Sequence, residues 1–208
     1  MKVFVLFLFT FTIFLWHSQA LFDTSPNWVE IENFRQIQEV IVSSDHLVAL
    51  FFYNTYDCSK CQQAENTIDR FSDELVGLVK FYHIDCDKIW DEAEMQERFP
   101  ICNPKNIREL PQLVYYRPAI MRINPETGNF NQPKEIVYTG EVSIKAIAKF
   151  TKEILPDYSQ TIKTANDLES FLGFKEIPNK VILFTDRDET PTLYRGLTAE
   201  FRDKLWVF

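Results

Sequence analysis

The motif Cys-Ser-Lys-Cys at residues 58–61 constrains the fold most, because of the segments on either side of it. The run before it, residues 47–53, reads Leu-Val-Ala-Leu-Phe-Phe-Tyr, which predicts a buried strand. After it, apolar residues recur at the three- and four-residue spacing of a helix: Ala64, Ile68, Phe71, Leu75 and Leu78. We therefore predict that a buried strand leads directly into a helix whose N-terminus carries the first cysteine.

This position favours Cys58 as the reactive thiol of the pair. The unpaired N–H groups and the positive end of the helix dipole favour a thiolate over a thiol. Lys60 adds a positive charge nearby, and Asp57 opposes it. Cys61 lies one turn further along and can close on Cys58. The pattern favours a redox-active pair, but half of a zinc site or a purely structural disulfide could use the same motif.

Residues 1–20 predict a signal peptide for secretion. Lys2 supplies a short positive start, residues 3–16 are almost wholly apolar, and Ser18 and Ala20 are small residues of the kind that a signal peptidase recognises. The apolar run is too short for a comfortable membrane span, and an uncleaved anchor is the alternative. We expect the protein in the lumen of the endoplasmic reticulum or outside the cell, where oxidising conditions preserve disulfides.

The rest of the chain is acidic. Without residues 1–20 it has 21 basic and 30 acidic residues, a formal net charge of −9. No basic tract remains, which argues against a nucleic-acid partner. A membrane contact is expected only if the signal segment is uncleaved or if a missing C-terminal part carries an anchor.

The remaining periodicity predicts an α/β domain with a central mixed sheet. We expect strands at residues 28–31, 46–53, 79–85, 112–116 and 135–138, and helices at residues 34–41, 58–78, 91–99 and 144–155. The early strand–helix–strand units predict a parallel section of sheet, and the final hairpin predicts an antiparallel edge. Of the two histidines in these strands, His83 is expected to pack inside and His46 to face solvent.

These features resemble a thioredoxin-fold protein of the protein disulfide isomerase family. The match covers residues 27–155 and is carried by the strand–C-x-x-C–helix unit, by Leu110-Pro111-Gln112, and by Gly140 followed by a helix. It implies a redox domain over residues 27–155. In that domain Cys58 is the attacking nucleophile and Cys61 is the resolving thiol.

The resemblance also implies the substrate contacts of this domain. The family's proline at the position of Pro111 is cis and faces the cysteines, and a cis X-Pro bond is uncommon enough to need a reason. Together with Leu110 it exposes backbone polar groups beside the cysteines, where a substrate strand can pair. Tyr56, the aromatic residue nearest to the cysteines, is taken as a further substrate contact.

The implied activity is that of a thiol–disulfide oxidoreductase or isomerase that assists disulfide formation in secretory-pathway proteins. Its partners would be unfolded or cysteine-containing client proteins, and it requires no metal and no organic cofactor. The chain departs from the family in having Asp57 before the first cysteine and no carboxylate in residues 49–52, where the family has a buried acid. Slow release of mixed disulfides follows from the missing acid. The alternative is a non-catalytic folding or scaffold module with a structural C-x-x-C disulfide.

Two further cysteines fit the same resemblance. Related domains carry Asp-Cys at the place of Cys86 and a cysteine upstream of the proline at the place of Cys102, which implies a structural disulfide between them. Two free buried thiols are an alternative. A four-cysteine zinc site is another, although this second pair lacks the usual knuckle spacing.

Residues 156–208 restart the pattern without cysteines. We expect strands at residues 160–163, 180–185 and 205–208 and helices at residues 165–171 and 193–204. This segment resembles the incomplete start of a second, cysteine-free thioredoxin-like domain. The natural protein is therefore expected to be longer than this chain.

Overall fold

The computed structural model describes residues 26–56, 58–89, 102, 110–118, 133–173, 175, 179–202, 204 and 206–207. The predicted signal peptide at residues 1–20, the predicted helix at residues 91–99 and Asp57 lie outside these ranges. Within the described ranges, no helix is both long enough and apolar enough to cross a membrane.

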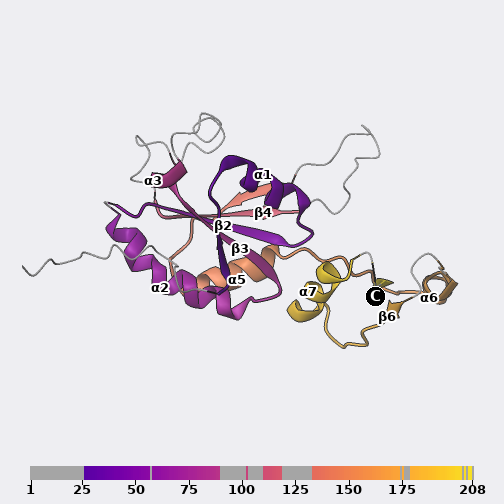
Figure 1. The fold of residues 1–208 in the computed structure, drawn as a ribbon. Helices are drawn as coiled ribbons and strands as arrows, with labels where there is room; N and C mark the ends of the chain where they lie inside the picture. Colours follow the sequence, from indigo (N-terminus) through magenta and orange to yellow (C-terminus); the bar gives the residue numbers. More distant parts are fainter. Residues whose placement is uncertain are drawn as a thin grey trace, which may run out of the picture.

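A five-stranded mixed sheet forms the centre of the molecule (Figure 1). Its strands, in the spatial order β1-β3-β2-β4-β5, are β1 (Trp28–Glu30), β3 (Val79–Asp85), β2 (Leu47–Tyr53), β4 (Gln112–Arg117) and β5 (Lys134–Val137). Strands β1 and β2 run parallel to β3, whereas β4 is antiparallel to both β2 and β5. The predicted parallel section and antiparallel hairpin are confirmed.

Helices cover both faces of the sheet. Helix α1 (Phe34–Ser43) lies on the face opposite α2 (Ser59–Glu74) and α5 (Ile144–Ile154) (Figure 1). Helix α2 ends four residues earlier than predicted, because the chain turns at Gly77, whose φ of 77° is a conformation that favours glycine. Leu78 still packs against the core, so the apolar spacing continues beyond the end of the helix.

Strand β2 lies at the centre of the core, and all seven of its residues are buried. Phe81 of β3 packs against Phe71 of α2 and against Trp28 of β1, with ring centroids 5.5 and 5.0 Å away. Tyr115 of β4 packs against Phe150 of α5, with ring centroids 5.8 Å apart. All the buried residues of this core cluster lie between Trp28 and Leu155.

The chain after residue 155 forms a smaller parallel strand–helix–strand unit. It contains α6 (Ala165–Gly173), β6 (Lys180–Val181), α7 (Thr192–Glu200) and β7 (Trp206–Val207), and β6 is parallel to β7.

Two predictions for this segment are wrong. Residues 160–163 form no strand, and the buried strand predicted at residues 180–185 is reduced to its first two residues. Among the described residues, β6 pairs only with the two-residue strand β7, so the rest of the apolar run forms no strand pairing. Phe184, in that part of the run, is 89% exposed.

Helix α7 and the residues just after it contact the part of the chain before residue 156, mainly through polar groups. Arg195 donates hydrogen bonds to the backbone carbonyls of Lys152, at 3.1 Å, and of Leu155. Arg202 forms an ion pair with Asp45 at 3.0 Å. Gly196 lies so close to Leu78 that a Cβ atom would overlap the leucine side chain.

This packing buries His46, so the prediction that His46 faces solvent is wrong. The residue is 8% exposed, and its Nε2 lies 3.1 Å from a carboxylate oxygen of Glu200 at the end of α7. Burial lowers the pKa of His46, and the Lys80 ammonium lowers it further, whereas the carboxylates of Glu200 and Asp45 act in the opposite direction. The net lowering means that the folded protein favours the neutral imidazole.

We predict that this histidine makes stability depend on pH just below neutrality. Because the folded pKa is lowered, the unfolded chain takes up the proton first as the pH falls below about 6.5. The free energy of unfolding should then fall by at most about 1.4 kcal/mol per pH unit until the folded pKa is reached. Urea unfolding between pH 7.5 and 5.5 should show a shallower fall for His46→Gln than for wild type. Equal slopes would contradict the assignment.

Candidate functional site

The cysteine motif follows strand β2, at one end of the sheet. Cys58 is the N-cap of α2, and it forms a disulfide with Cys61 in the first turn, with the two Cα atoms 5.2 Å apart. The backbone N–H of Cys61 donates to the Cys58 sulfur at 3.1 Å, and the N–H of Gln62 donates to the Cys58 carbonyl at 3.3 Å. The Cys61 N–H is therefore directed at the Cys58 sulfur, where it would stabilise the negative charge of a Cys58 thiolate.

The two cysteines differ in access. Cys58 is 8% exposed, whereas Cys61 is fully buried beneath the first turn of α2. An incoming thiolate attacks a disulfide along the S–S axis and needs access to one sulfur. The geometry thus favours attack at Cys58, with Cys61 as the internal partner.

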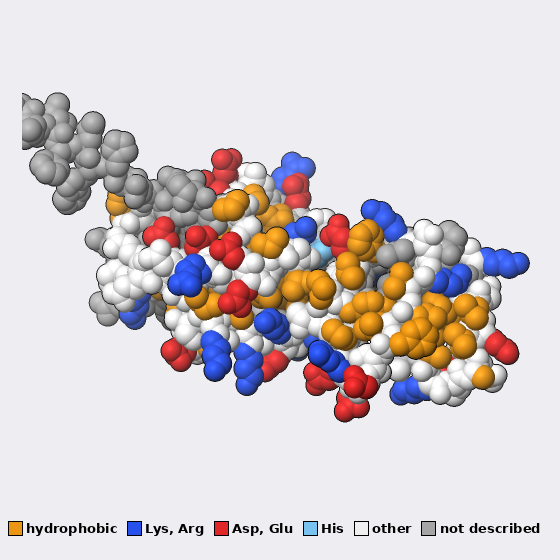
Figure 2. Space-filling model, turned by 90° about the horizontal axis from the view of Figure 1, so that it is seen from below, with side chains coloured by type: hydrophobic (Ala, Val, Ile, Leu, Met, Phe, Trp, Pro, Cys, Tyr) orange, Lys and Arg blue, Asp and Glu red, His pale blue; other side chains and the backbone are white. Residues whose placement is uncertain are grey.

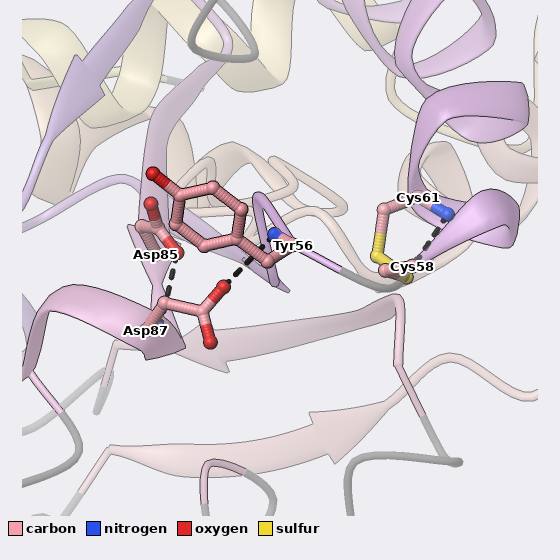
Figure 3. The surroundings of a disulfide bond; sticks show 5 residues. All are labelled: Tyr56, Cys58, Cys61, Asp85 and Asp87. Atoms are coloured by element: carbon pink, nitrogen blue, oxygen red, sulfur yellow. Dashed lines mark hydrogen bonds between the residues drawn. A yellow bond between two sulfur atoms is a disulfide. The ribbon is translucent and has the colours of Figure 1, made fainter. Parts of the chain in front are cut away.

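The other residues predicted for this site are spread around the motif. Lys60 is exposed in the first turn of α2, and Asp57 lies outside the described residues. Tyr56 is 65% exposed, just before the motif. In the view of Figure 3, its ring extends from the backbone on the side away from the disulfide.

The Leu110–Pro111 peptide bond is cis. Gln112, the next residue, pairs with Phe52 near the end of β2, so Pro111 lies at the end of the sheet from which the chain continues to Cys58. The side chain of Leu110 is buried. Any contact of Leu110 with a bound strand therefore uses its backbone groups.

Cys86 and Cys102 form a second disulfide, with their Cα atoms 5.0 Å apart. Cys86 is the first residue of the short helix α3 (Cys86–Ile89), which follows β3 directly. Both cysteines are buried, at 2% and 5% exposure. The disulfide therefore joins Cys102 to the residue that directly follows β3.

Sequence reasoning missed the acidic residues on either side of Cys86. Asp85 ends β3 and accepts a hydrogen bond from the Thr55 hydroxyl at 2.6 Å. Asp87 accepts one from the backbone N–H of Tyr56 at 3.0 Å, as Figure 3 shows. Among the described residues, Asp85 is the only buried carboxylate. The signal in the sequence is the pattern Asp-Cys-Asp at residues 85–87, which places an acid on each side of a cysteine.

All four cysteines of the chain are paired in these two disulfides. In the part of the chain that the structure describes, no cluster of three or more His, Cys, Asp or Glu residues is placed to hold a metal ion.

Comparisons with known proteins agree with this geometry. No family model matches the chain. It is 29% identical over 202 residues to a putative protein disulfide-isomerase of Dictyostelium discoideum, covering 97% of this chain and 45% of the relative. It is 20% identical over 191 residues to protein disulfide-isomerase MPD1 of Saccharomyces cerevisiae, covering 90% and 57%. A crystal structure of ERdj5 (form II) superimposes with a TM-score of 0.59 at 16% identity, covering 90% of this chain and 22% of that one.

The chain is a thioredoxin-fold protein that resembles the protein disulfide isomerases. It spans about half the length of the curated relatives that it matches. In this disulfide-isomerase-like chain, the cysteine pair at the start of α2 is the candidate redox site.

We predict that the second disulfide stabilises the fold more than the first does. It joins residues 16 apart in sequence, whereas Cys58 and Cys61 are three apart, and closing the longer loop removes more entropy from the unfolded chain. Replacing Cys86 and Cys102 with Ala should lower the free energy of unfolding by about 3 kcal/mol. Denaturant unfolding under oxidising conditions measures this, with the Cys58→Ala/Cys61→Ala variant as the matched control. An equal or smaller loss in the Cys86/Cys102 variant would contradict the prediction.

Proposed function

We propose that this chain acts as a thiol–disulfide oxidoreductase or isomerase on cysteine-containing proteins. One observation carries the proposal: Cys58, which is 8% exposed, caps α2, accepts the Cys61 N–H on its sulfur, and is bonded to a fully buried Cys61. This asymmetry gives one accessible sulfur and one internal resolving thiol. The likeness to proteins named as disulfide isomerases supports the same activity.

In the oxidising direction, a client thiolate attacks the Cys58 sulfur and breaks the Cys58–Cys61 bond. Cys61 leaves as a thiolate, and a mixed disulfide joins the client to Cys58. A second client thiolate then attacks the client sulfur of that mixed disulfide, forms the client disulfide and releases Cys58 as a thiolate. Two electrons thus pass from the client to the cysteine pair. The helical N–H groups stabilise the leaving Cys58 thiolate.

In the reverse direction, the Cys58 thiolate attacks a client disulfide, and Cys61 resolves the mixed disulfide. In isomerisation, the Cys58 thiolate attacks a client disulfide and releases one client thiolate. Another thiolate of the same client then attacks the client sulfur of the mixed disulfide, forms a different client disulfide and releases Cys58 as a thiolate, so no electrons are transferred overall. Both directions use the same two sulfurs, so the geometry of the pair serves oxidation, reduction and isomerisation alike.

The substrate contacts belong to the same proposal. The exposed ring of Tyr56 and the backbone around Leu110 and Pro111 lie at the end of the sheet that leads to Cys58. Together they could hold an extended client segment across the cysteines, and Lys60 would favour the thiolate form of Cys58. The predicted signal peptide supports action on unfolded clients in the endoplasmic reticulum lumen or outside the cell.

We also propose that residues 156–208 belong to a second, cysteine-free thioredoxin-like unit. The parallel β6–α7–β7 arrangement is the kind of unit from which such a domain is built. Hydrophobic side chains gather on the surface of this part of the molecule (Figure 2). They include Leu168, Leu172, Val181, Phe184, Leu193 and Leu197. An apolar surface of this kind fits a segment that packs against further structure.

The redox proposal predicts that replacing Cys58 and replacing Cys61 block different steps of the exchange reaction. Cys58→Ser should abolish exchange with a disulfide-containing peptide. Cys61→Ser should allow the first attack but trap the mixed disulfide, which mass spectrometry of acid-quenched samples detects. In the reduced wild-type protein, iodoacetamide at pH 6 should label Cys58 before Cys61, because Cys58 caps the helix and is the less buried of the two, at 8% against 0% exposure. Preferential labelling of Cys61, or no exchange by the wild type, would instead indicate a purely structural disulfide.

A further inference from the structure

We propose that Asp85 and Asp87 are positioning residues of the redox site, which hold the loop that presents Cys58 to its substrate. This inference rests on the proposed function, because it concerns how Cys58 meets a client. The loop is the short connection between the end of β2 at Tyr53 and the start of α2. Its described residues between these elements are 54–56 and 58.

Asp85 holds the first half of this loop. It lies at the end of β3 directly opposite Tyr53, the last residue of β2, and it is only 2% exposed. One carboxylate oxygen accepts the Thr55 hydroxyl at 2.6 Å, and the other accepts the backbone N–H of Asp87 at 3.1 Å. Hydrogen bonds to an ionised group are stronger than those between neutral groups, and burial increases the difference.

Asp87 holds the second half. Its carboxylate accepts the backbone N–H of Tyr56, two residues before Cys58, at 3.0 Å. The bond is made to the main chain, so it fixes the path of the loop and leaves the Tyr56 ring exposed. Because the Asp87 N–H is itself held by Asp85, the two carboxylates form one connected network across the loop.

The support for this network is rigid. Asp85 ends a strand that is paired on both sides, and Cys86 between the two acids is anchored by its buried disulfide to Cys102. Helix α3, which carries Asp87, begins at Cys86. The backbone that carries the two carboxylates is therefore anchored independently of the loop that they hold, as preorganised positioning requires.

The network acts through the loop and not on the sulfur atoms. Figure 3 shows the two carboxylates on one side of the Tyr56 backbone and the disulfide on the other. Each oxygen of Asp85 accepts a hydrogen bond, one from the loop and one from Asp87, so the role proposed for this residue is that of an acceptor in the network. We therefore predict an effect of geometry. The rate of exchange with a client needs an aligned sulfur, so it should depend on the network more than the rate of simple alkylation does.

Two substitutions at one position separate geometry from charge. Asp87→Leu removes the acceptor for the Tyr56 N–H, whereas Asp87→Asn keeps an oxygen acceptor and removes only the charge. With Asp87→Leu, the rate at which the reduced protein attacks a disulfide-containing peptide should fall on the order of tenfold, while its rate of iodoacetamide alkylation changes little. Asp87→Asn should keep both rates near those of wild type.

Two further variants complete the design. Thr55→Val removes the hydroxyl that Asp85 accepts, at nearly constant shape, and should repeat the selective loss even if Asp87→Leu folds poorly. Asp167→Leu is the matched control, because Asp167 also accepts backbone N–H groups, from Lys163 at 3.0 Å and Thr164 at 2.9 Å, but at the start of α6. It should leave both rates unchanged.

The outcomes separate this inference from the proposed function. Wild-type exchange together with wild-type rates in Thr55→Val and Asp87→Leu would overturn the positioning role alone. If Asp87→Leu and Asp87→Asn changed the rates of exchange and alkylation equally, the charge would matter and the hydrogen bond would not. That result would also overturn the positioning role. No exchange by the wild-type protein would overturn the proposed function and, with it, this role.

Discussion

The pairing of β2 on both of its edges is the constraint on which the rest of the structure depends. One edge of β2 pairs with β3 in parallel and the other with β4 antiparallel. These registers bring three distant segments to one end of the sheet. Tyr53 stands opposite Asp85, Phe52 stands opposite Gln112, which follows Pro111, and the chain beyond β2 leads to Cys58. The strand register alone thus brings the parts of the candidate site together, without any contact from a side chain of the loop.

The same constraint explains where the polar groups of the site come from. Every side chain of β2 is buried between the helices on the two faces of the sheet, and burying an unpaired carboxylate there would be costly. The acidic residues instead lie at the end of β3, as Asp85, and in the first turn of α3, as Asp87, where a loop hydroxyl and a backbone N–H group are available as donors. The site of this chain therefore has a carboxylate network beside the loop and none on the strand beneath it.

Much of this architecture could be predicted because it follows from local periodicity. The apolar run of β2, the alternation of β3 and the helical spacing after Cys58 each mark an element by the side chains that it buries. What could not be predicted depends on contacts between distant segments. The burial of His46 arises from α7, more than 140 residues later, and the hydrogen bond from Thr55 to Asp85 depends on strand register. The apolar run at residues 180–185 looked like a buried strand, but a strand also needs a ladder partner, which periodicity does not report.

The two disulfides illustrate how the surroundings of a bond decide its use. Both close over similar Cα separations, 5.2 and 5.0 Å, so backbone spacing does not distinguish them. They differ in what surrounds each sulfur. Cys58 caps a helix of 16 residues and receives an N–H on its sulfur, both of which favour a leaving thiolate. Cys86 begins a helix of four residues, too short to supply a comparable dipole, and is shielded together with Cys102. The first bond is therefore placed for exchange, and the second is placed to hold α3, and with it Asp87, against the loop that leads to the first.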